Sequence, residues 1–314
     1  MRVLLTGADG FAGGWLARQL LATGHHVAGT HRPDARPSPV LGQSEIDRVE
    51  WRTLELGSSE SVHQASAGPW DVVFHLAAVS SGSEARSDPG RAWEVNAGGT
   101  ARLAEALGEQ RRSGSDPLLV LVSTGEVYGL GEGKPRHEDD PVMPCSPYAA
   151  SKAGAEVAAL EVARRTGLRV MVARAFPHTG PGQDPRFVVP ALAERLLAAK
   201  RIRAPVIKAG NLDAVRDLLD VRDATRGYLT LAERGTAGTV YNVASGSGRA
   251  LVDVAGQLME LIGWKVTIET DGKLLRRSDI QHLVGDSARL RELGWSPAVP
   301  FDQTLKDLVN AQTH

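Results

Sequence analysis

The sequence has a single cysteine, Cys145, among its 314 residues. An intrachain disulfide and a cysteine-cluster metal site are therefore excluded, and the nine histidines show no metal-ligand spacing. The chain also has no apolar run near the roughly 18 residues that cross a bilayer. It opens with the strand-like MRVLLTG, where a secretory leader would carry a charged and then an apolar segment. We expect a cytoplasmic protein with no metal and no membrane contact.

The chain also lacks an excess of charge of either sign. Lys and Arg number 36 against 37 Asp and Glu, which leaves a net charge of −1. No stretch combines basic with aromatic residues as a nucleic-acid face would, so we expect no nucleic-acid partner. The chain shows no internal repeat, and its 42% hydrophobic content supports a folded interior.

What the sequence does have is a regular alternation of short apolar runs with helical stretches. Runs of this kind, unbroken by polar residues, are typical of a parallel sheet that is covered on both faces. We predict an α/β fold, a doubly wound Rossmann sheet over residues 1–175 to which about 223–242 return. Residues 176–314 are expected to form mainly a smaller substrate-binding lobe over the carboxyl ends of the strands. The predicted strands are 3–6, 27–29, 51–56, 72–76, 118–123 and 169–174, with helices beginning near Phe11, Arg91 and Ser146.

Three spaced glycines follow the first predicted strand. Gly7, Gly10 and Gly13 lie between that strand and an amphipathic helix. Glycines in this place allow a tight turn and let a pyrophosphate approach the helix N-terminus. The pattern predicts dinucleotide binding; a tight turn without a ligand is the alternative.

The end of the second strand bears on which dinucleotide binds. It carries Thr30, His31 and Arg32, and no acidic residue that would bind the ribose 2′-hydroxyl of NAD. A guanidinium suits a 2′-phosphate, although it can also be an ordinary exposed arginine. NADPH is therefore favoured as the cofactor, and NADH stays possible. Glu55, after the third strand, is expected to meet the adenine, and Ala77 and Ala78 to let the dinucleotide lie close.

A tyrosine and a lysine are spaced for proton transfer. In CSPYAASKAGAE, Ser146 can cap a helix, and Tyr148 and Lys152 lie four apart on one face. This helix follows the strand that ends at Thr124, so hydroxyl, phenol and ammonium should meet in one cleft. An adjacent ammonium and a cationic nicotinamide both favour phenolate, and we expect Lys152 to tune the pKa of Tyr148 in that direction. The set predicts redox chemistry between a carbonyl and an alcohol, with Tyr148 exchanging the proton and Thr124 hydrogen-bonding the oxygen.

Together these motifs resemble the extended short-chain dehydrogenases/reductases, in the nucleotide-sugar epimerase/dehydratase group. The stretches HTGPGQDPRFVVPALAE, GNLDAVRDLLDVRDATRGYLTLAERGTAGTVYNVASG and LVGDSARLRELGW resemble the GDP-4-keto-6-deoxy-D-mannose reductases, which form GDP-D-rhamnose. The resemblance implies a nucleotide-diphosphate sugar as substrate and favours a GDP-sugar. It also implies cofactor contacts from Phe11, Leu56, Leu76, Tyr148, Lys152 and His178, and substrate contacts from Ser80, Glu126, Arg216 and Arg276.

Glu126 leaves two activities open. A glutamate at this place moves protons in the 4,6-dehydratases of the group, but the reductases carry one too, and we expect a substrate-holding role.

Two residues depart from the group's pattern: Pro177 stands where an asparagine is usual and Leu218 where a phenylalanine is usual. A 4,6-dehydratase or 4-epimerase, and a non-catalytic dinucleotide-binding sensor, are the alternatives.

The helices near Arg91 and Ser146 predict a homodimer. AGAEVAALEVA carries small and apolar residues on more of its circumference than one sheet can cover.

Overall fold

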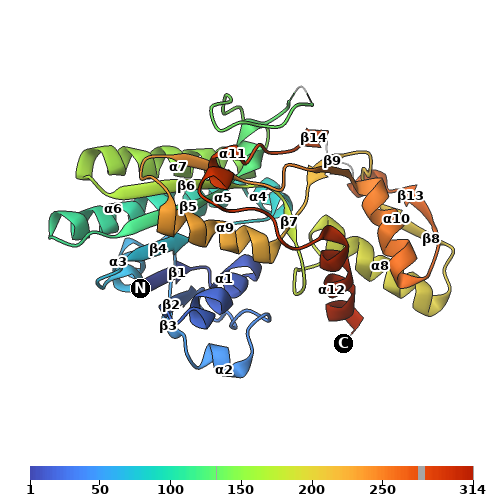
Figure 1. Cartoon of the computed structure of the whole chain (residues 1–314), viewed down its shortest axis with the longest axis horizontal. Helices are drawn as coiled ribbons and strands as arrows, with labels where there is room; N and C mark the ends of the chain where they lie inside the picture. The colour runs from blue at the N-terminus through green and yellow to red at the C-terminus, as the bar shows by residue number, and fades with distance from the viewer. Residues whose placement is uncertain (132, 275–279, 314) are drawn as a thin grey trace.

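A seven-stranded parallel sheet forms the centre of the computed structural model, which describes residues 1–131, 133–274 and 280–313 (Figure 1). The strand order is β11-β6-β5-β4-β1-β2-β3. The chain builds the sheet outward from β1 to β3 and then, in the opposite sense, from β4 to β11, as in doubly wound folds. The predicted fold class is confirmed. The strands are β1 Arg2–Thr6, β2 His26–His31, β3 Glu50–Thr53, β4 Val72–His75, β5 Leu118–Thr124, β6 Arg169–Ala175 and β11 Val240–Val243.

Both faces of the sheet are buried because its strands are apolar at consecutive positions. Leu4 packs in one hydrophobic cluster, whereas Val3 and Leu5 pack in another on the opposite face. The helices that cover the two faces are α1 and α9 on one side and α3, α6 and α7 on the other. The helices are α1 Phe11–Ala22, α2 Gln43–Ile46, α3 Ser59–Ser66, α4 Gly82–Ser87, α5 Pro89–Trp93, α6 Gly99–Arg112, α7 Pro147–Thr166, α8 Val188–Ile202, α9 Val221–Arg234, α10 Leu251–Ile262, α11 Ala288–Glu292 and α12 Phe301–Thr313.

The predicted third strand is wrong in its extent. The sequence predicts pairing over 51–56, but pairing ends at Thr53. Leu54 and Leu56 are buried all the same, because they pack under the helical layer of α3 and α6 and do not extend the ladder. The helix predicted near Arg91 begins at Pro89, and a π-helical turn over Glu94–Gly98 joins it to α6.

A separate hydrophobic core lies toward the C-terminus. It is built from α8, α10 and α12, together with the two-stranded sheet of β8 Val206–Ala209 and β13 Thr267–Thr270. Two small sheets lie between this core and the large sheet. They contain β7 His178–Thr179 with β10 Leu219–Asp220, and β9 Val215–Asp217 between β12 Gly248–Ala250 and β14 His282–Leu283.

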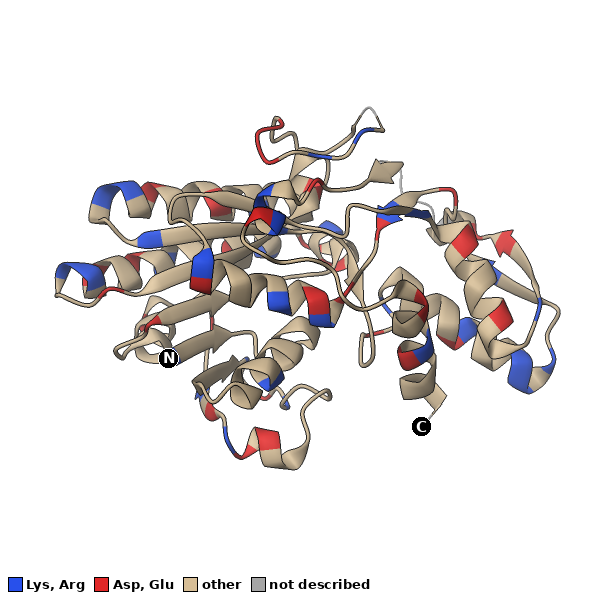
Figure 2. Ribbon diagram, in the orientation of Figure 1, with Lys and Arg blue, Asp and Glu red and all other residues tan. Residues whose placement is uncertain are grey.

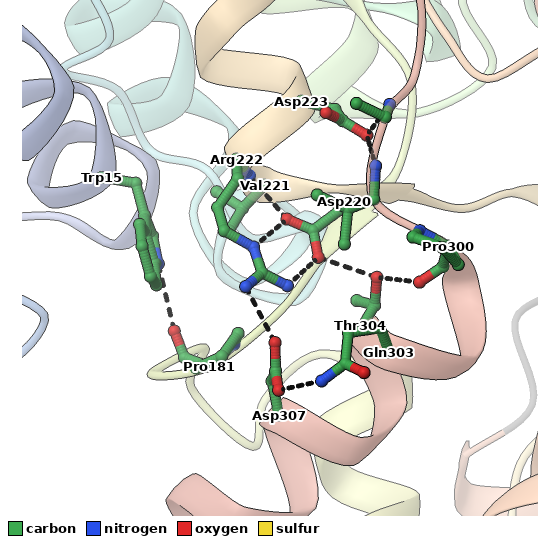
Figure 3. Close-up of polar contacts among 12 residues, drawn as sticks. Trp15, Pro181, Asp220, Val221, Arg222, Asp223, Pro300, Gln303, Thr304 and Asp307 are labelled. Carbon is green, nitrogen blue, oxygen red and sulfur yellow. Dashed lines mark hydrogen bonds and ion pairs between the residues drawn. The ribbon is translucent and has the colours of Figure 1, made fainter.

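An ion-pair network joins α9 to the C-terminal helix α12 (Figure 3). Asp220 caps α9 and receives two hydrogen bonds from the Arg222 guanidinium, at 2.8 Å each. Arg222 also pairs with Asp307 at 2.8 Å, and Thr304 donates to Asp220 at 2.7 Å. Since Asp220 belongs to β10, α12 is tied directly to the small sheet that carries His178.

Charges of both signs are interspersed along the helices of the two cores (Figure 2). Within the described ranges, no helix combines the length and the apolar character that a bilayer crossing needs.

Candidate active site

The end of β5 and the start of α7 bring a hydroxyl, a phenol and an ammonium together. Ser146 caps α7 by accepting a hydrogen bond from Ala149 N at 3.1 Å, which fixes the first turn and therefore the position of Tyr148. The Tyr148 phenol lies near the Thr124 hydroxyl, whose hydrogen bonding acts to lower the phenol pKa, and Lys152 lies buried one turn further along the helix. The geometry therefore allows a proton donor and a second hydrogen-bond donor to act on one oxygen.

The phenol of Tyr148 has a raised pKa. Burial is the largest cause and the nearby Glu126 carboxylate adds to it, while the hydrogen bond with Thr124 opposes both. The expectation that the pKa of Tyr148 is lowered is therefore wrong for the protein by itself, because desolvation outweighs the stabilisation of the phenolate. A phenol with a raised pKa stays protonated at neutral pH, as an acid must.

Lys152 is tuned in the opposite direction. Burial lowers the pKa of its ammonium to about 8, and the Glu156 carboxylate, one turn further along α7, partly restores it. Below pH 8 the ammonium keeps its charge. A charge at this place can stabilise the phenolate that forms when Tyr148 gives up its proton.

Behind the site lies a buried ion pair that the sequence reasoning missed. Arg174, at the end of β6, binds Glu156 through Nε at 3.1 Å and Nη2 at 2.8 Å, and each side chain is 6% exposed. Ser123 also donates to Glu156, and the guanidinium lies 4.8 Å from the ring centre of Tyr128. This cluster ties α7 to β5 and β6, and so it fixes the helix that carries Tyr148. The available signal was the spacing of Glu156 four residues after Lys152.

Glu126 enters the site from the turn after β5. It lies in a 3-10 turn, Gly125–Tyr128, and its amide donates to Thr124 Oγ1 at 3.2 Å. The side chain is half-buried, and its charge reaches the Tyr148 phenol. The structure therefore brings together Thr124, Glu126, Tyr148 and Lys152.

The glycine loop has the shape that a pyrophosphate requires. Gly7 has φ +76°, and a Cβ there would lie 2.8 Å from Ala77 N; at Gly13 a Cβ would lie 2.0 Å from Gly7 O. Gly10 is the N-cap of α1 and supplies no side-chain acceptor to the first turn. The first amides of the helix can therefore bind an anion, which fits a dinucleotide. Thr30 supports this loop by accepting a hydrogen bond from Gly7 N at 3.2 Å.

Arg32 has a neighbour that the sequence reasoning missed. Its side chain is 76% exposed, and its Nε lies 3.7 Å from the carboxylate of Asp9 in the glycine loop. Asp9 is 11% exposed. A carboxylate here attracts a 2′-hydroxyl and repels a 2′-phosphate, so two side chains of opposite preference lie at the adenosine end of the loop.

The other expected residues lie around this loop and cleft. The rings of Phe11 and His178 stack at 6.3 Å, and burial lowers the pKa of His178. Leu56 is buried, whereas Glu55 and Ser80 are exposed. Leu76, Ala77 and Ala78 follow β4, Arg216 lies half-buried in β9, and Arg276 lies outside the described residues. Among the described residues, no group of three or more His, Cys, Asp or Glu side chains could hold a metal ion.

Comparison with known proteins decides the family. The sequence profile of the GDP-mannose 4,6 dehydratase family matches residues 4–308. The chain belongs to this family. It is thus an NAD(P)-dependent enzyme of the extended short-chain dehydrogenase/reductase type, as the motifs predicted.

Within the family, the relatives differ in activity. A GDP-6-deoxy-D-mannose reductase of Pseudomonas aeruginosa is 36% identical over 244 residues, covering 76% of this chain and 79% of the relative. A UDP-glucose 4-epimerase of Mycolicibacterium smegmatis is 31% identical over 314 residues, covering 98% and 97%. The solved structure of RMD from Pseudomonas aeruginosa, complexed with NADPH, has a TM-score of 0.84 and 31% identity, covering 99% of this chain and 98% of that one.

Exchange of Arg32 for alanine should weaken NADPH far more than NADH, because only NADPH carries the phosphate that a guanidinium would bind. We expect the Kd of NADPH to rise about tenfold or more, the size of a lost charge-assisted hydrogen bond. Asp9→Asn should act in the opposite direction and tighten NADPH. Fluorescence titration of both reduced cofactors measures the four constants. Equal changes for NADPH and NADH in Arg32→Ala would exclude the assignment.

Proposed function

We propose that the protein reduces the C4 carbonyl of a nucleotide-activated 4-keto-6-deoxy sugar with NADPH. The proposed substrate is GDP-4-keto-6-deoxy-D-mannose and the product GDP-D-rhamnose. The neighbouring side chains of Thr124 and Tyr148, with Lys152 one turn away, carry the proposal. The similarity to a GDP-6-deoxy-D-mannose reductase supports the choice of sugar and base.

Each side chain has a defined task in this reaction. Bound NADPH supplies the hydride for the carbonyl carbon. Tyr148 gives its proton to the carbonyl oxygen, and the Thr124 hydroxyl hydrogen-bonds that oxygen and orients it. Lys152 stabilises the phenolate that remains until solvent returns the proton. Because the pKa of Tyr148 is raised, its phenol carries the proton before the reaction begins.

The proposal is tested by following the absorbance of the reduced cofactor. Purified protein with NADPH is given GDP-, UDP-, dTDP- and CDP-linked 4-keto-6-deoxy sugars in turn, and the products are identified by mass spectrometry. We expect stoichiometric loss of NADPH with the GDP sugar above all. Turnover of a GDP-, UDP- or dTDP-hexose without net change in the cofactor would instead favour the alternative, a 4,6-dehydratase or a 4-epimerase. The intact Thr124, Tyr148 and Lys152 argue against a non-catalytic sensor.

Glu126→Gln separates reduction from dehydration. Reduction needs no proton abstraction at C5, so a substrate-holding Glu126 can be replaced by a neutral residue of the same shape with most of the activity kept. In deuterated water, the unsubstituted protein should add no solvent deuterium at C5 or C6. Enzyme-dependent deuterium at either carbon, lost in Glu126→Gln, would contradict the reductase proposal and make Glu126 the base.

Self-association is proposed through the layer of α5, α6 and α7. Trp93 of α5 and Val157 of α7 are 46% and 67% exposed, which leaves apolar surface on this layer for a second copy. We expect a homodimer in light scattering at micromolar concentration. A strictly monomeric mass would contradict it.

The limits of the two lobes and a cytoplasmic location remain predictions.

A further inference from the structure

Two arginines lie opposite each other on neighbouring strands of the three-stranded sheet. Strands β9 and β12 are antiparallel, and Arg249 of β12 is the direct partner of Arg216 of β9. Directly opposed residues project to the same face with their Cβ atoms about 5 Å apart. The side chains of Arg216 and Arg249 therefore project from the same face of this sheet, side by side.

This face is the one that looks toward the catalytic strands. Leu283 of β14 is the partner of Arg216 on the other side of β9, and it projects to the same face. Leu283 packs in one cluster with Phe176. A Cβ on Gly125, the residue after Thr124, would meet the Phe176 ring at 2.9 Å. The arginine pair thus lies on the active-site side of the small sheet.

The Arg249 guanidinium has hydrogen-bonding capacity to spare. Its Nε is buried and has no hydrogen-bond partner, and its contact is with the ring of Phe301, whose centre is 4.3 Å from the guanidinium carbon. In the described ranges no carboxylate lies within ion-pair distance of it. A buried donor without an acceptor is costly, and it stays in place where a ligand supplies the acceptor.

We propose that Arg249 acts with Arg216 as the second arm of a clamp on the diphosphate of the sugar nucleotide. The inference rests on the proposed function and assigns a binding residue to it. A diphosphate carries two negative charges and offers oxygens on both phosphorus atoms, which matches two planar guanidinium forks held side by side. The clamp would recognise the diphosphate of any nucleotide sugar and leave the choice of base to other residues.

The position of Arg249 is held by the C-terminal helix. Phe301 is the first residue of α12, and its ring supports the guanidinium from one side. Further along the same helix, Thr304 and Asp307 are bound to Asp220 and Arg222 (Figure 3). Helix α12 is therefore fixed to the core of the fold, and the arginine is oriented before any ligand arrives.

Calorimetric titration of NADPH-saturated protein with GDP tests the clamp, since saturation blocks the glycine loop. The variants are Arg249→Met, which keeps apolar cover on Phe301 but removes the charge, and Arg249→Lys, which keeps the charge without the fork. Arg201→Ala removes an exposed arginine of α8 and serves as the matched control. UDP, inorganic pyrophosphate and guanosine are titrated beside GDP, and thermal unfolding verifies that each variant is folded.

For Arg249→Met, the Kd of GDP, UDP and pyrophosphate should rise about tenfold or more, with guanosine and NADPH unchanged. Arg249→Lys should recover part of the loss, and Arg201→Ala should bind as the unsubstituted protein does. GDP binding that is unaltered in a folded Arg249→Met protein would overturn the clamp while leaving the proposed function intact. Failure of the unsubstituted protein to bind any nucleoside diphosphate would overturn the proposed function and the clamp with it.

Discussion

Exchange of Tyr148 for phenylalanine is expected to lower the turnover number by roughly a hundredfold to ten-thousandfold, the usual contribution of a positioned general acid. The ring and its packing remain, so only the proton donor is lost. Steady-state kinetics with a 4-keto sugar measures the loss, and fluorescence titration should find the Kd of NADPH nearly unchanged. A fall in kcat with little change in cofactor binding identifies an interaction made in the transition state.

Tyr241→Phe provides the matched control. Tyr241 lies in β11, at the edge of the sheet, and its hydroxyl accepts a hydrogen bond from Thr236 N at 3.0 Å. Loss of that hydroxyl should leave turnover within a factor of about two, because its hydrogen-bond partner is the backbone amide of Thr236, which is not a residue of the candidate active site. If Tyr148→Phe retained most of the activity, Tyr148 would not be the acid, and Lys152 and Glu126 would be the next candidates among the described residues of the cleft.

Of the substitutions discussed, removal of Glu156 should lower the free energy of unfolding the most. In Glu156→Ala the Arg174 guanidinium stays buried and loses its carboxylate, and a broken buried pair of this kind typically costs about 3–5 kcal/mol. Denaturant or thermal unfolding measures the loss. Glu161→Ala, on the same helix, is the control: its partner Arg165 is 47% exposed, and we expect a cost below about 1 kcal/mol.

A double exchange distinguishes loss of pairing from loss of packing. Glu156→Leu with Arg174→Met should recover much of the stability, because an apolar pair of similar volume replaces the two buried charges. Equal destabilisation by Glu156→Ala and Glu161→Ala would contradict the buried-pair assignment. Activity has its own signature: Glu156 raises the pKa of Lys152, so its loss should shift the falling limb of the pH profile from about pH 8 to lower pH.

The sequence predicted the sheet well because each central strand is apolar at consecutive positions. Such runs report burial on both faces, and the run at Leu118 corresponds closely to β5. The same rule failed at Leu54 and Leu56, since burial alone does not show whether an apolar residue is in a ladder or beneath a helix. The grouping of Thr124, Tyr148 and Lys152 could be predicted, because one residue ends a strand and the other two lie four apart in the helix that follows it.

The residues that the sequence reasoning missed depend on contacts between distant segments. Arg249 becomes informative only through the register that sets it opposite Arg216, 33 positions earlier in the chain. Asp9 matters because the glycine loop turns it toward Arg32. The direction of the pKa shift at Tyr148 was predicted wrongly because desolvation depends on the whole packed site, whereas a motif shows only neighbouring charges.

The place of β11 in the sheet has a consequence for how the chain folds during its synthesis. Strand β6 is complete at residue 175, but its outer neighbour, β11, begins only at residue 240. At typical translation rates the ribosome needs roughly 3 to 13 seconds to make the 64 residues between them. Throughout that interval the nascent sheet ends in the apolar β6, whose free edge can pair with another chain. The stage of synthesis most exposed to aggregation therefore lies between residues 175 and 240, after every residue of the Tyr148 and Lys152 motif has been made.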